Sequence, residues 1–235
     1  MLMALSRDRL LEAGPIDTLC QHINDLGFKA EIVRGSVVVS PMTTRLHSRV
    51  VHRLTKALSP LVLQHEWELH QTVAVRIPPE RGDMRLPDLL VMPSDDELGE
   101  GQVDGAACLL AAEVCSPGTR DVDYRDKPHE YARVGIPLYL ILDPLIEPPS
   151  STLMSEPGNG YYEKVTVVEA GKPLALPPPF GITIDTGVLF GSVGEKGDVL
   201  DEGGEVAGVQ EVDRADGLVR ADVVEGGADP AEGRA

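Results

Sequence analysis

The sequence has few cysteines and no long apolar run. Its 235 residues include only three cysteines, Cys20, Cys108 and Cys115, at a spacing that fits no zinc motif. A small, odd number of cysteines argues against a disulfide framework and indicates the reducing cytoplasm. No apolar stretch approaches the roughly 20 residues of a transmembrane helix, and charged residues interrupt the apolar start too early for a signal peptide. We therefore predict a cytoplasmic protein with no membrane partner.

Several common catalytic signatures are also missing. The chain has no Gly-x-Ser-x-Gly nucleophile elbow and no Gly-rich loop that ends in Gly-Lys-Ser or Gly-Lys-Thr. The sequence therefore lacks the signatures of α/β-hydrolase esterases and of P-loop nucleotidases, and carboxylates become the main candidates for chemistry.

Positive charge is scarce, and the negative charge is unevenly distributed. The chain carries 38 acidic and 21 basic residues, for a net charge of −17. Residues 192–235 hold 12 of the acids and 4 of the bases, with many glycines and no aromatic residue. Such a segment cannot bury enough apolar area to offset the entropy lost on ordering. We predict a folded domain at 1–191 and a disordered acidic C-terminal tail at 192–235.

The first 191 residues mix helical and strand patterns, which predicts an α/β fold with a mixed central β-sheet flanked by helices. The stretch Glu147–Gly160 is rich in Pro, Ser and Gly and is predicted to be a loop. The expected helices are 15–26, a helix capped by Thr43 or Thr44 that runs to about residue 65, and 122–134. The expected strands are 30–33, 37–39, 67–77, 86–92, 109–115, 137–142, 161–169 and 182–184.

Two carboxylates lie inside short apolar runs. Asp88 follows Pro87 in the run 86–92, and Glu113 lies in the run 109–115. Runs of this kind predict buried strands, in which an uncompensated acid is costly. Since side chains alternate faces along a strand, adjacent strands would let both carboxylates project toward one point. A shared cation would compensate both, and oxygen ligands favour Mg²⁺ or Mn²⁺.

A more ordinary arrangement is also consistent with these residues. Each carboxylate could instead pair with an arginine such as Arg85 or Arg120. Further along the chain, Asp123 and Lys127 are four residues apart and share one helix face. They would form either an exposed ion pair, worth a few tenths of a kcal/mol, or a lysine delivered to the carboxylates from a helix.

The order Pro-Asp, a strand carrying Glu, and then a lysine resembles the PD-(D/E)xK nuclease superfamily. The superfamily lysine usually lies two residues after the Glu, where this chain has Cys115. The segment from Glu113-Val114-Cys115 through Asp123 and Lys127 to Gly135-Ile136-Pro137 resembles the Uma-two family of restriction-endonuclease-like proteins, in which the lysine lies on the following helix. The resemblance covers roughly Glu31 to Phe190 and does not include the tail.

The resemblance implies a restriction-endonuclease-like fold and Mg²⁺- or Mn²⁺-dependent hydrolysis of phosphodiester bonds, most naturally in DNA. The implied catalytic residues are Asp88 and Glu113, as metal ligands, and Lys127. The implied supporting residues are Asp123, His47 and Glu31. Cleavage of both strands of a duplex would favour a homodimer.

The second predicted helix carries a stripe of basic residues. Arg45, Arg49, Arg53 and Lys56 recur along one side of the second helix. They form either a solvated face or a strip that contacts DNA phosphates.

The domain could also be a catalytically silent module that binds nucleic acid or protein, or a hydrolase that uses Asp88 and Glu113 as an acid–base pair.

Overall fold

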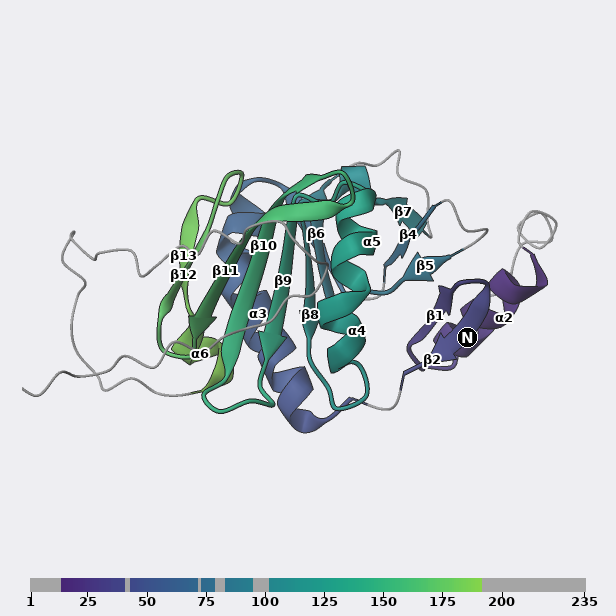
Figure 1. The fold of residues 1–235 in the computed structure, drawn as a ribbon, viewed down its shortest axis with the longest axis horizontal. Coiled ribbons are helices and arrows are strands. Elements are labelled where there is room, and N and C mark those ends of the chain that lie inside the picture. The colour runs from purple at the N-terminus through teal and green to yellow at the C-terminus, as the bar shows by residue number, and fades with distance from the viewer. Residues whose placement is uncertain (1–13, 41–42, 72, 79–82, 95–101, 192–235) are drawn as a thin grey trace, which may run out of the picture.

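A computed structural model describes residues 14–40, 43–71, 73–78, 83–94 and 102–191 (Figure 1). The predicted disordered tail at 192–235 lies outside these residues. No helix within the described ranges is both long and apolar enough to cross a membrane.

A mixed six-stranded sheet forms the centre of the molecule, which confirms the predicted fold class. Its strand order is β11-β10-β9-β8-β6-β3, in which only β8 and β9 pair in parallel. The strands are β3 (Trp67–His70), β6 (Leu89–Pro93), β8 (Leu110–Val114), β9 (Leu138–Asp143), β10 (Ser150–Gly158) and β11 (Tyr161–Glu169).

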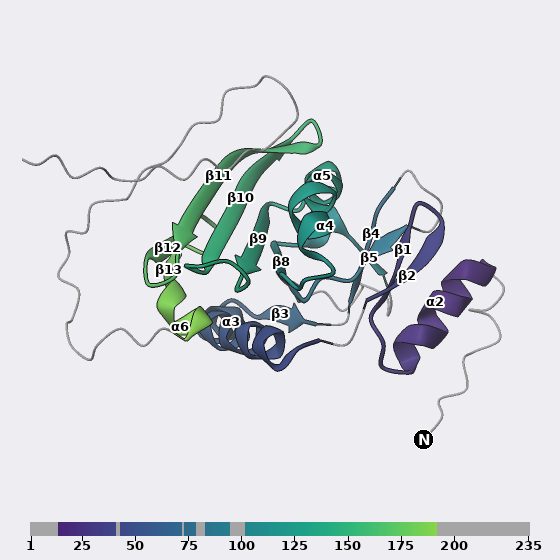
Figure 2. The same ribbon diagram turned by 60° about the horizontal axis from the view of Figure 1, so that its bottom comes forward.

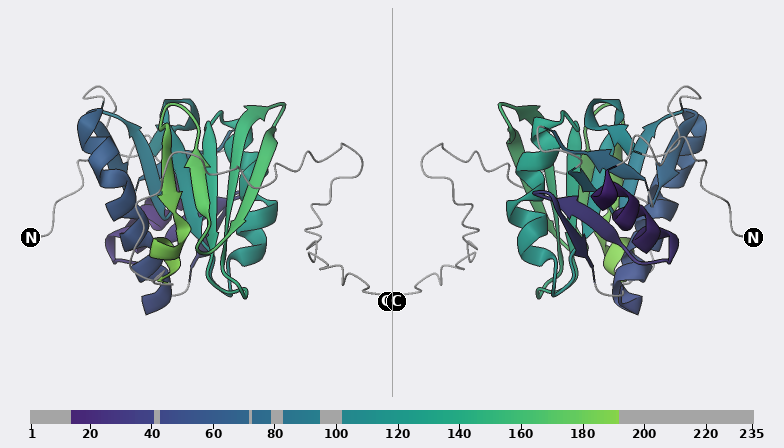
Figure 3. Two further views of the ribbon diagram at one scale, coloured as in Figure 1. Left: turned by 90° about the vertical axis from the view of Figure 1, so that its left-hand side faces the viewer. Right: turned by 90° about the vertical axis from the view of Figure 1, so that its right-hand side faces the viewer.

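Helices cover both faces of this sheet, as Figures 2 and 3 show. The long helix α3 (Arg45–Gln64) packs Val50, Leu54 and Leu58 on one face, together with Leu89 and Leu140 of the sheet. Its N-cap is Thr44, whose hydroxyl accepts from the backbone N–H of His47 at 3.2 Å, as the capping pattern predicted. The small hairpin of β12 (Pro173–Leu176) and β13 (Ile182–Asp185) and the short helix α6 (Thr186–Phe190) contribute to the same core.

The opposite face carries two short helices where the sequence predicted one. These are α4 (Arg120–Arg125) and α5 (Lys127–Arg133), separated at Asp126. Pro128 has no N–H to donate and is favoured in the first turn of a helix, so a new helix begins here. Lys127 is therefore the first residue of α5.

A second sheet of five strands, in the order β2-β1-β5-β4-β7, lies beside the first and was not predicted (Figure 1). Its hairpin β1–β2 packs against α2. The elements are α2 (Pro15–Asp25), β1 (Ala30–Val33), β2 (Ser36–Val39), β4 (Ala74–Arg76), β5 (Met84–Arg85) and β7 (Gln102–Asp104), followed by a 3-10 turn, η1 (Gly105–Ala107).

One predicted strand is divided between the two sheets, and a second begins where the chain crosses from one sheet to the other. The run 67–77 divides into β3 of the large sheet and β4 of the small one. The run 86–92 enters the large sheet only at Leu89, and β5 of the small sheet ends just before this run, at Arg85. Pro87 cannot donate to a β-ladder, so the chain changes sheets at this residue. Asp88 therefore lies at the crossing from one sheet to the other.

The predicted loop at 147–160 is wrong, because most of it is the nine-residue strand β10. This strand pairs with β11 from Ser150 to Gly158 and with β9 from Ser150 to Ser155. Ser150, Ser151 and Thr152 are buried, and Leu153 joins the main core. Pairing on both sides satisfies the backbone of these polar residues, so tertiary context overrides their turn-like composition.

Close packing at η1 leads to a stability prediction. A Cβ at Gly105 would collide with the side chain of Val134, at the end of α5, and would lie 2.8 Å from its carbonyl oxygen. We expect Gly105→Ala to destabilise the domain by about 1–3 kcal/mol, the usual cost of overpacking. Thermal unfolding measures this effect.

Gly158→Ala is the matched control, because its new methyl group would meet only the flexible end of Glu163, with Oε1 at 3.1 Å. Equal melting temperatures for the two variants would contradict the proposed close contact.

Candidate functional site

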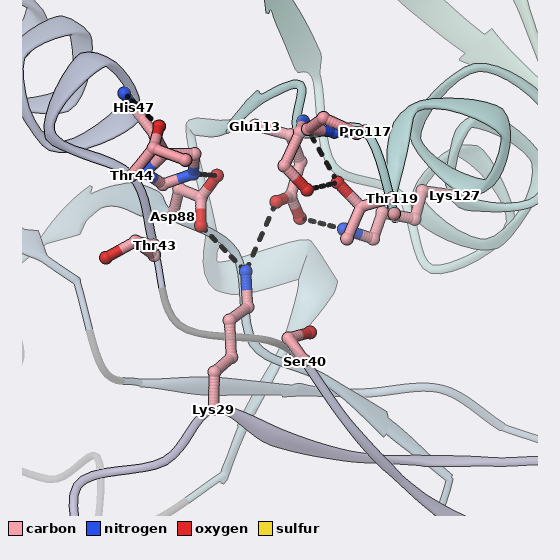
Figure 4. A pocket seen from close by; sticks show the side chains of 12 residues that line it. Lys29, Ser40, Thr43, Thr44, His47, Asp88, Glu113, Pro117, Thr119 and Lys127 are labelled. Carbon is pink, nitrogen blue, oxygen red and sulfur yellow. Dashed lines mark hydrogen bonds and ion pairs between the residues drawn. The ribbon is translucent and has the colours of Figure 1, made fainter.

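The two predicted carboxylates lie side by side between neighbouring strands. Asp88 immediately precedes β6 and Glu113 lies near the end of β8, flanking the antiparallel pair of Leu89 and Ala112. The next residues on their faces, Leu90 and Ala111, pack in the core beneath α5. The predicted alternation of faces is therefore confirmed, and both side chains border one pocket of about 250 Å³ (Figure 4).

Asp88 is held on both of its oxygens. Oδ1 lies 2.7 Å from Nζ of Lys29, and Oδ2 lies 2.9 Å from Nε2 of His47. The backbone N–H of Val114 also donates to Oδ2, at 2.8 Å. Burial raises the pKa of Asp88, but Lys29 and His47 outweigh burial and lower it overall. These contacts therefore favour the ionised form of Asp88 at the pocket.

Glu113 lies deeper and is only 1% exposed. Its Oε1 is 2.8 Å from Nζ of Lys127 and accepts from the hydroxyl of Tyr131 at 3.0 Å. Its Oε2 faces Nζ of Lys29 at 3.5 Å. Burial raises the pKa of Glu113 to about 7, although Lys127 and Lys29 act against this rise. A further cation near Oε2 would therefore favour the ionised form of Glu113.

Lys127 and Asp123 form a buried ion pair, so the prediction of an exposed pair is wrong. Nζ of Lys127 lies 2.7 Å from Oδ1 of Asp123, and the two residues are 2% and 1% exposed. Burial lowers the pKa of Lys127, but Glu113, Glu31 and Asp123 outweigh burial and raise it. The other oxygen of Asp123, Oδ2, is buried without a hydrogen-bond partner. Lys127 is therefore enclosed between two acids.

Sequence reasoning missed Lys29, which contacts both central carboxylates. Lys29 lies immediately before β1, and its backbone oxygen accepts from Ser40 of the same hairpin at 2.8 Å. One signal was available, because Lys29 lies two residues before Glu31 and therefore on the same strand face. What the sequence could not indicate is that this face is turned toward the large sheet.

Glu31 supports the chain next to Asp88 and does not line the pocket. Its Oε1 accepts from the backbone N–H of Leu86 at 2.8 Å, and its Oε2 pairs with Arg85 at 3.1 Å. Arg85 also binds Glu130 of α5 through two hydrogen bonds, at 2.6 and 2.9 Å. Burial opposes the charge of Glu31, but Lys127, Lys29 and Arg85 lower its pKa overall. This network joins the small sheet to the helix that carries Lys127.

The alternative in which arginines neutralise the two carboxylates is wrong. Arg85 binds Glu31 and Glu130, as described above. Arg120 binds Asp143 at 2.7 Å and lies over the ring of Tyr124. Lysines therefore compensate the central pair of acids.

The predicted basic stripe lies outside the pocket. Arg45, Arg49 and Lys56 are exposed on α3. Arg53 is half-buried and donates to the backbone oxygen of Leu189 in α6 at 3.3 Å. Arg53 thus takes part in packing, which leaves Arg45 and Arg49 as the arginines free to meet a ligand beside the start of α3.

The donor set fits a divalent cation held by two carboxylates. Among the described residues, no group of three or more His, Cys, Asp or Glu side chains is arranged to hold a metal ion. Mg²⁺ usually takes only one or two carboxylates and keeps several waters. Asp88 Oδ1 and Glu113 Oε2 already converge on one cation, the ammonium of Lys29, at 2.7 and 3.5 Å. The pair therefore meets the requirement for Mg²⁺ or Mn²⁺.

Comparison with known proteins gives the family. The family model Uma2, described as "Putative restriction endonuclease", matches residues 16–187, well over half of the chain. The chain belongs to this family. Membership supports a nuclease, an enzyme that hydrolyses phosphodiester bonds. No curated protein matches the chain.

A solved structure shares the fold. It is described as a "putative nuclease belonging to DUF820" from Anabaena variabilis, and it superposes on this chain with a TM-score of 0.56 at 16% sequence identity. The match covers 69% of this chain and 89% of that one. At this identity the likeness concerns the fold alone, and it agrees with the predicted restriction-endonuclease-like architecture.

The burial of Lys127 leads to a second stability prediction. Lys127→Met leaves Glu113 and Asp123 buried without their common cation. Removing one partner of a buried ion pair typically costs about 3–5 kcal/mol. We expect a correspondingly large fall in the urea midpoint.

Lys164→Met is the control for this variant. Lys164 forms an exposed pair with Glu156, so its loss should leave the urea midpoint unchanged. If Lys127→Met unfolds at the same urea concentration as this control, the ion pairs of Lys127 contribute little to stability.

Proposed function

We propose that this protein is a Mg²⁺-dependent endonuclease that hydrolyses phosphodiester bonds in DNA. One observation carries the proposal. Asp88 and Glu113 come from neighbouring strands, and each presents one carboxylate oxygen to a single cation at the pocket. Family membership supports the same reaction class.

Asp88 and Glu113 would hold the metal, and their other oxygens are already fixed. His47 and the N–H of Val114 hold Oδ2 of Asp88, while Lys127 and Tyr131 hold Oε1 of Glu113. When bound, the metal would polarise the scissile phosphate and lower the pKa of the attacking water. Lys127 would add positive charge behind Glu113, and Asp123 would keep Lys127 in place.

DNA binding by so acidic a chain requires its positive charge to be concentrated. Helix α3 offers such a place, because its first turn contributes His47 to the pocket while Arg45 and Arg49 remain exposed. Both arginines lie two residues from His47 along the helix, so their side chains leave α3 on the face away from the pocket. They would contact phosphates of the DNA that lie away from the cleavage site.

One observation favours a second candidate, a catalytically silent module that binds nucleic acid. Lys29 already supplies a cation to both carboxylates, so the fold can neutralise them without a metal. Titration with Mn²⁺ separates the two functions, because a silent module has no need to bind the ion. Activity that persists in chelator would instead indicate a hydrolase using Asp88 and Glu113 as an acid–base pair.

Replacing either carboxylate tests the proposal. We expect Asp88→Asn and Glu113→Gln each to abolish cleavage of plasmid and of single-stranded DNA in Mg²⁺, because each removes a metal ligand. Calorimetry with Mn²⁺ should register the loss of binding directly.

Asp104→Asn and Glu68→Gln are matched controls, because both acids form exposed pairs away from the pocket. Cleavage that survives in both pocket variants would exclude Asp88 and Glu113 as the metal ligands. Absence of cleavage by the wild-type protein would exclude the nuclease assignment.

The exposed arginines of α3 provide a test of DNA binding. Arg45→Gln combined with Arg49→Gln should weaken binding to all sequences alike and reduce the salt slope of the affinity by roughly one unit per lost contact. Fluorescence anisotropy in Ca²⁺, which replaces Mg²⁺ to limit turnover, measures both quantities. We expect a smaller change for Arg53→Gln, because Arg53 is engaged with Leu189.

Lys172→Gln, an exposed lysine in the turn before β12, controls for the general loss of charge. A salt slope equal to that of the control would mean that this side of α3 is simply a solvated face.

A further inference from the structure

Two lysines approach Glu113 from different directions, and they differ in their access to the pocket. Lys127 reaches Oε1 from α5, and its side chain is 3% exposed and enclosed by Glu113 and Asp123. Lys29 reaches Oε2 from the small sheet, and its side chain is 22% exposed. In Figure 4, Lys29 extends from below toward Asp88 and Glu113, while Lys127 reaches Glu113 from the right.

The backbone that presents Lys29 is well fixed. The side chain of Asn24 in α2 binds both the N–H and the carbonyl oxygen of Ala30, at 2.8 and 3.0 Å. Ser40 donates to the carbonyl oxygen of Lys29 itself. Since a functional side chain needs a rigid base, these bonds favour a dedicated role for the ammonium of Lys29 over an incidental surface contact.

The chemistry needs a lysine that can touch a phosphate. The superfamily position, Cys115, is 1% exposed and packs in the core beneath α5. Lys127 also borders the pocket, but its side chain is only 3% exposed and already pairs with two buried acids. Lys29 lines the same pocket as the two carboxylates and the hydroxyl-bearing residues Ser40, Thr43 and Thr44.

We propose that Lys29 is the catalytic lysine, whose ammonium binds a non-bridging oxygen of the scissile phosphate, and that Lys127 is a positioning residue that holds Glu113. This proposal rests on the proposed nuclease function. Hydrolysis forms a P–O bond to the attacking water and breaks the P–O bond to the leaving oxygen, which gains a proton as the water loses one. Lys29 stays protonated and stabilises the charge that grows on the phosphate.

A charge-restoring experiment tests the proposal in the full-length protein. Lys29→Cys removes the ammonium, and treatment with 2-bromoethylamine converts the new thiol into a side chain that ends in an amine, like lysine. Cys20, Cys108 and Cys115 are all buried, and burial raises the pKa of each thiol, so reaction should favour position 29. Lys164→Cys, treated in the same way, is the matched control at an exposed lysine.

We expect the Lys29→Cys variant to cleave DNA at least about a hundredfold more slowly than the wild-type protein. Aminoethylation of the variant should raise its cleavage rate by at least about tenfold. Binding of Mn²⁺, measured by calorimetry, should persist or tighten, because an ammonium no longer neutralises the two carboxylates. The control should cleave at the wild-type rate before and after treatment.

Other results of the Lys29→Cys experiment would each contradict one part of the proposal. Cleavage by Lys29→Cys at the wild-type rate would exclude Lys29 as the catalytic lysine while leaving the nuclease function intact. Slow cleavage with loss of Mn²⁺ binding, or without rescue by the restored amine, would reduce Lys29 to a structural support. Absence of cleavage by the wild-type protein would exclude the nuclease and, with it, this role of Lys29.

Discussion

The shared compensation of two buried carboxylates is the constraint on which the structure depends. Asp88 and Glu113 are placed side by side by strand pairing, at a distance where two uncompensated anions would repel each other strongly. Lysines from two other parts of the chain compensate these charges, Lys29 from the position just before β1 and Lys127 from the first turn of α5. The arrangement of sheets and helices around the pocket follows from bringing these four residues together.

A second set of charged residues surrounds the pocket and is also held by paired charges. Arg85 binds Glu31 beneath the site and Glu130 on α5, so the small sheet and the helix are joined through one buried guanidinium. Glu31 in turn holds the N–H of Leu86, two residues before Asp88. Each charged group near the pocket thus has a partner that fixes its position, which is a condition for preorganised catalysis. The unpartnered oxygen of Asp123 is a departure from this pattern within the described residues.

The sequence was informative wherever the signal is local. Alternation along strands predicted that Asp88 and Glu113 would share one face if their strands were adjacent, and the capping pattern placed the start of α3 at Thr43 or Thr44, of which Thr44 is the cap. Resemblance to a family directed attention to Lys127, although its complete burial was not foreseen. The sequence failed where neighbours in space decide the outcome. The polar strand β10 is stabilised by pairing on both sides. Lys29 reaches Asp88 only through a contact between the two sheets, which no local sequence pattern encodes.

The wide separation of the site residues along the chain has a consequence for folding. Contacts in the pocket join residues 41, 59 and 84 positions apart, so the loops between them must close before the site exists. Lys127 is the last of its charged members to leave the ribosome. A nascent chain that ends before α5 holds both acids without one of the two lysines that compensate them. The site therefore cannot be complete until α5 has been synthesised, and a chain that ends before this helix lacks the finished pocket.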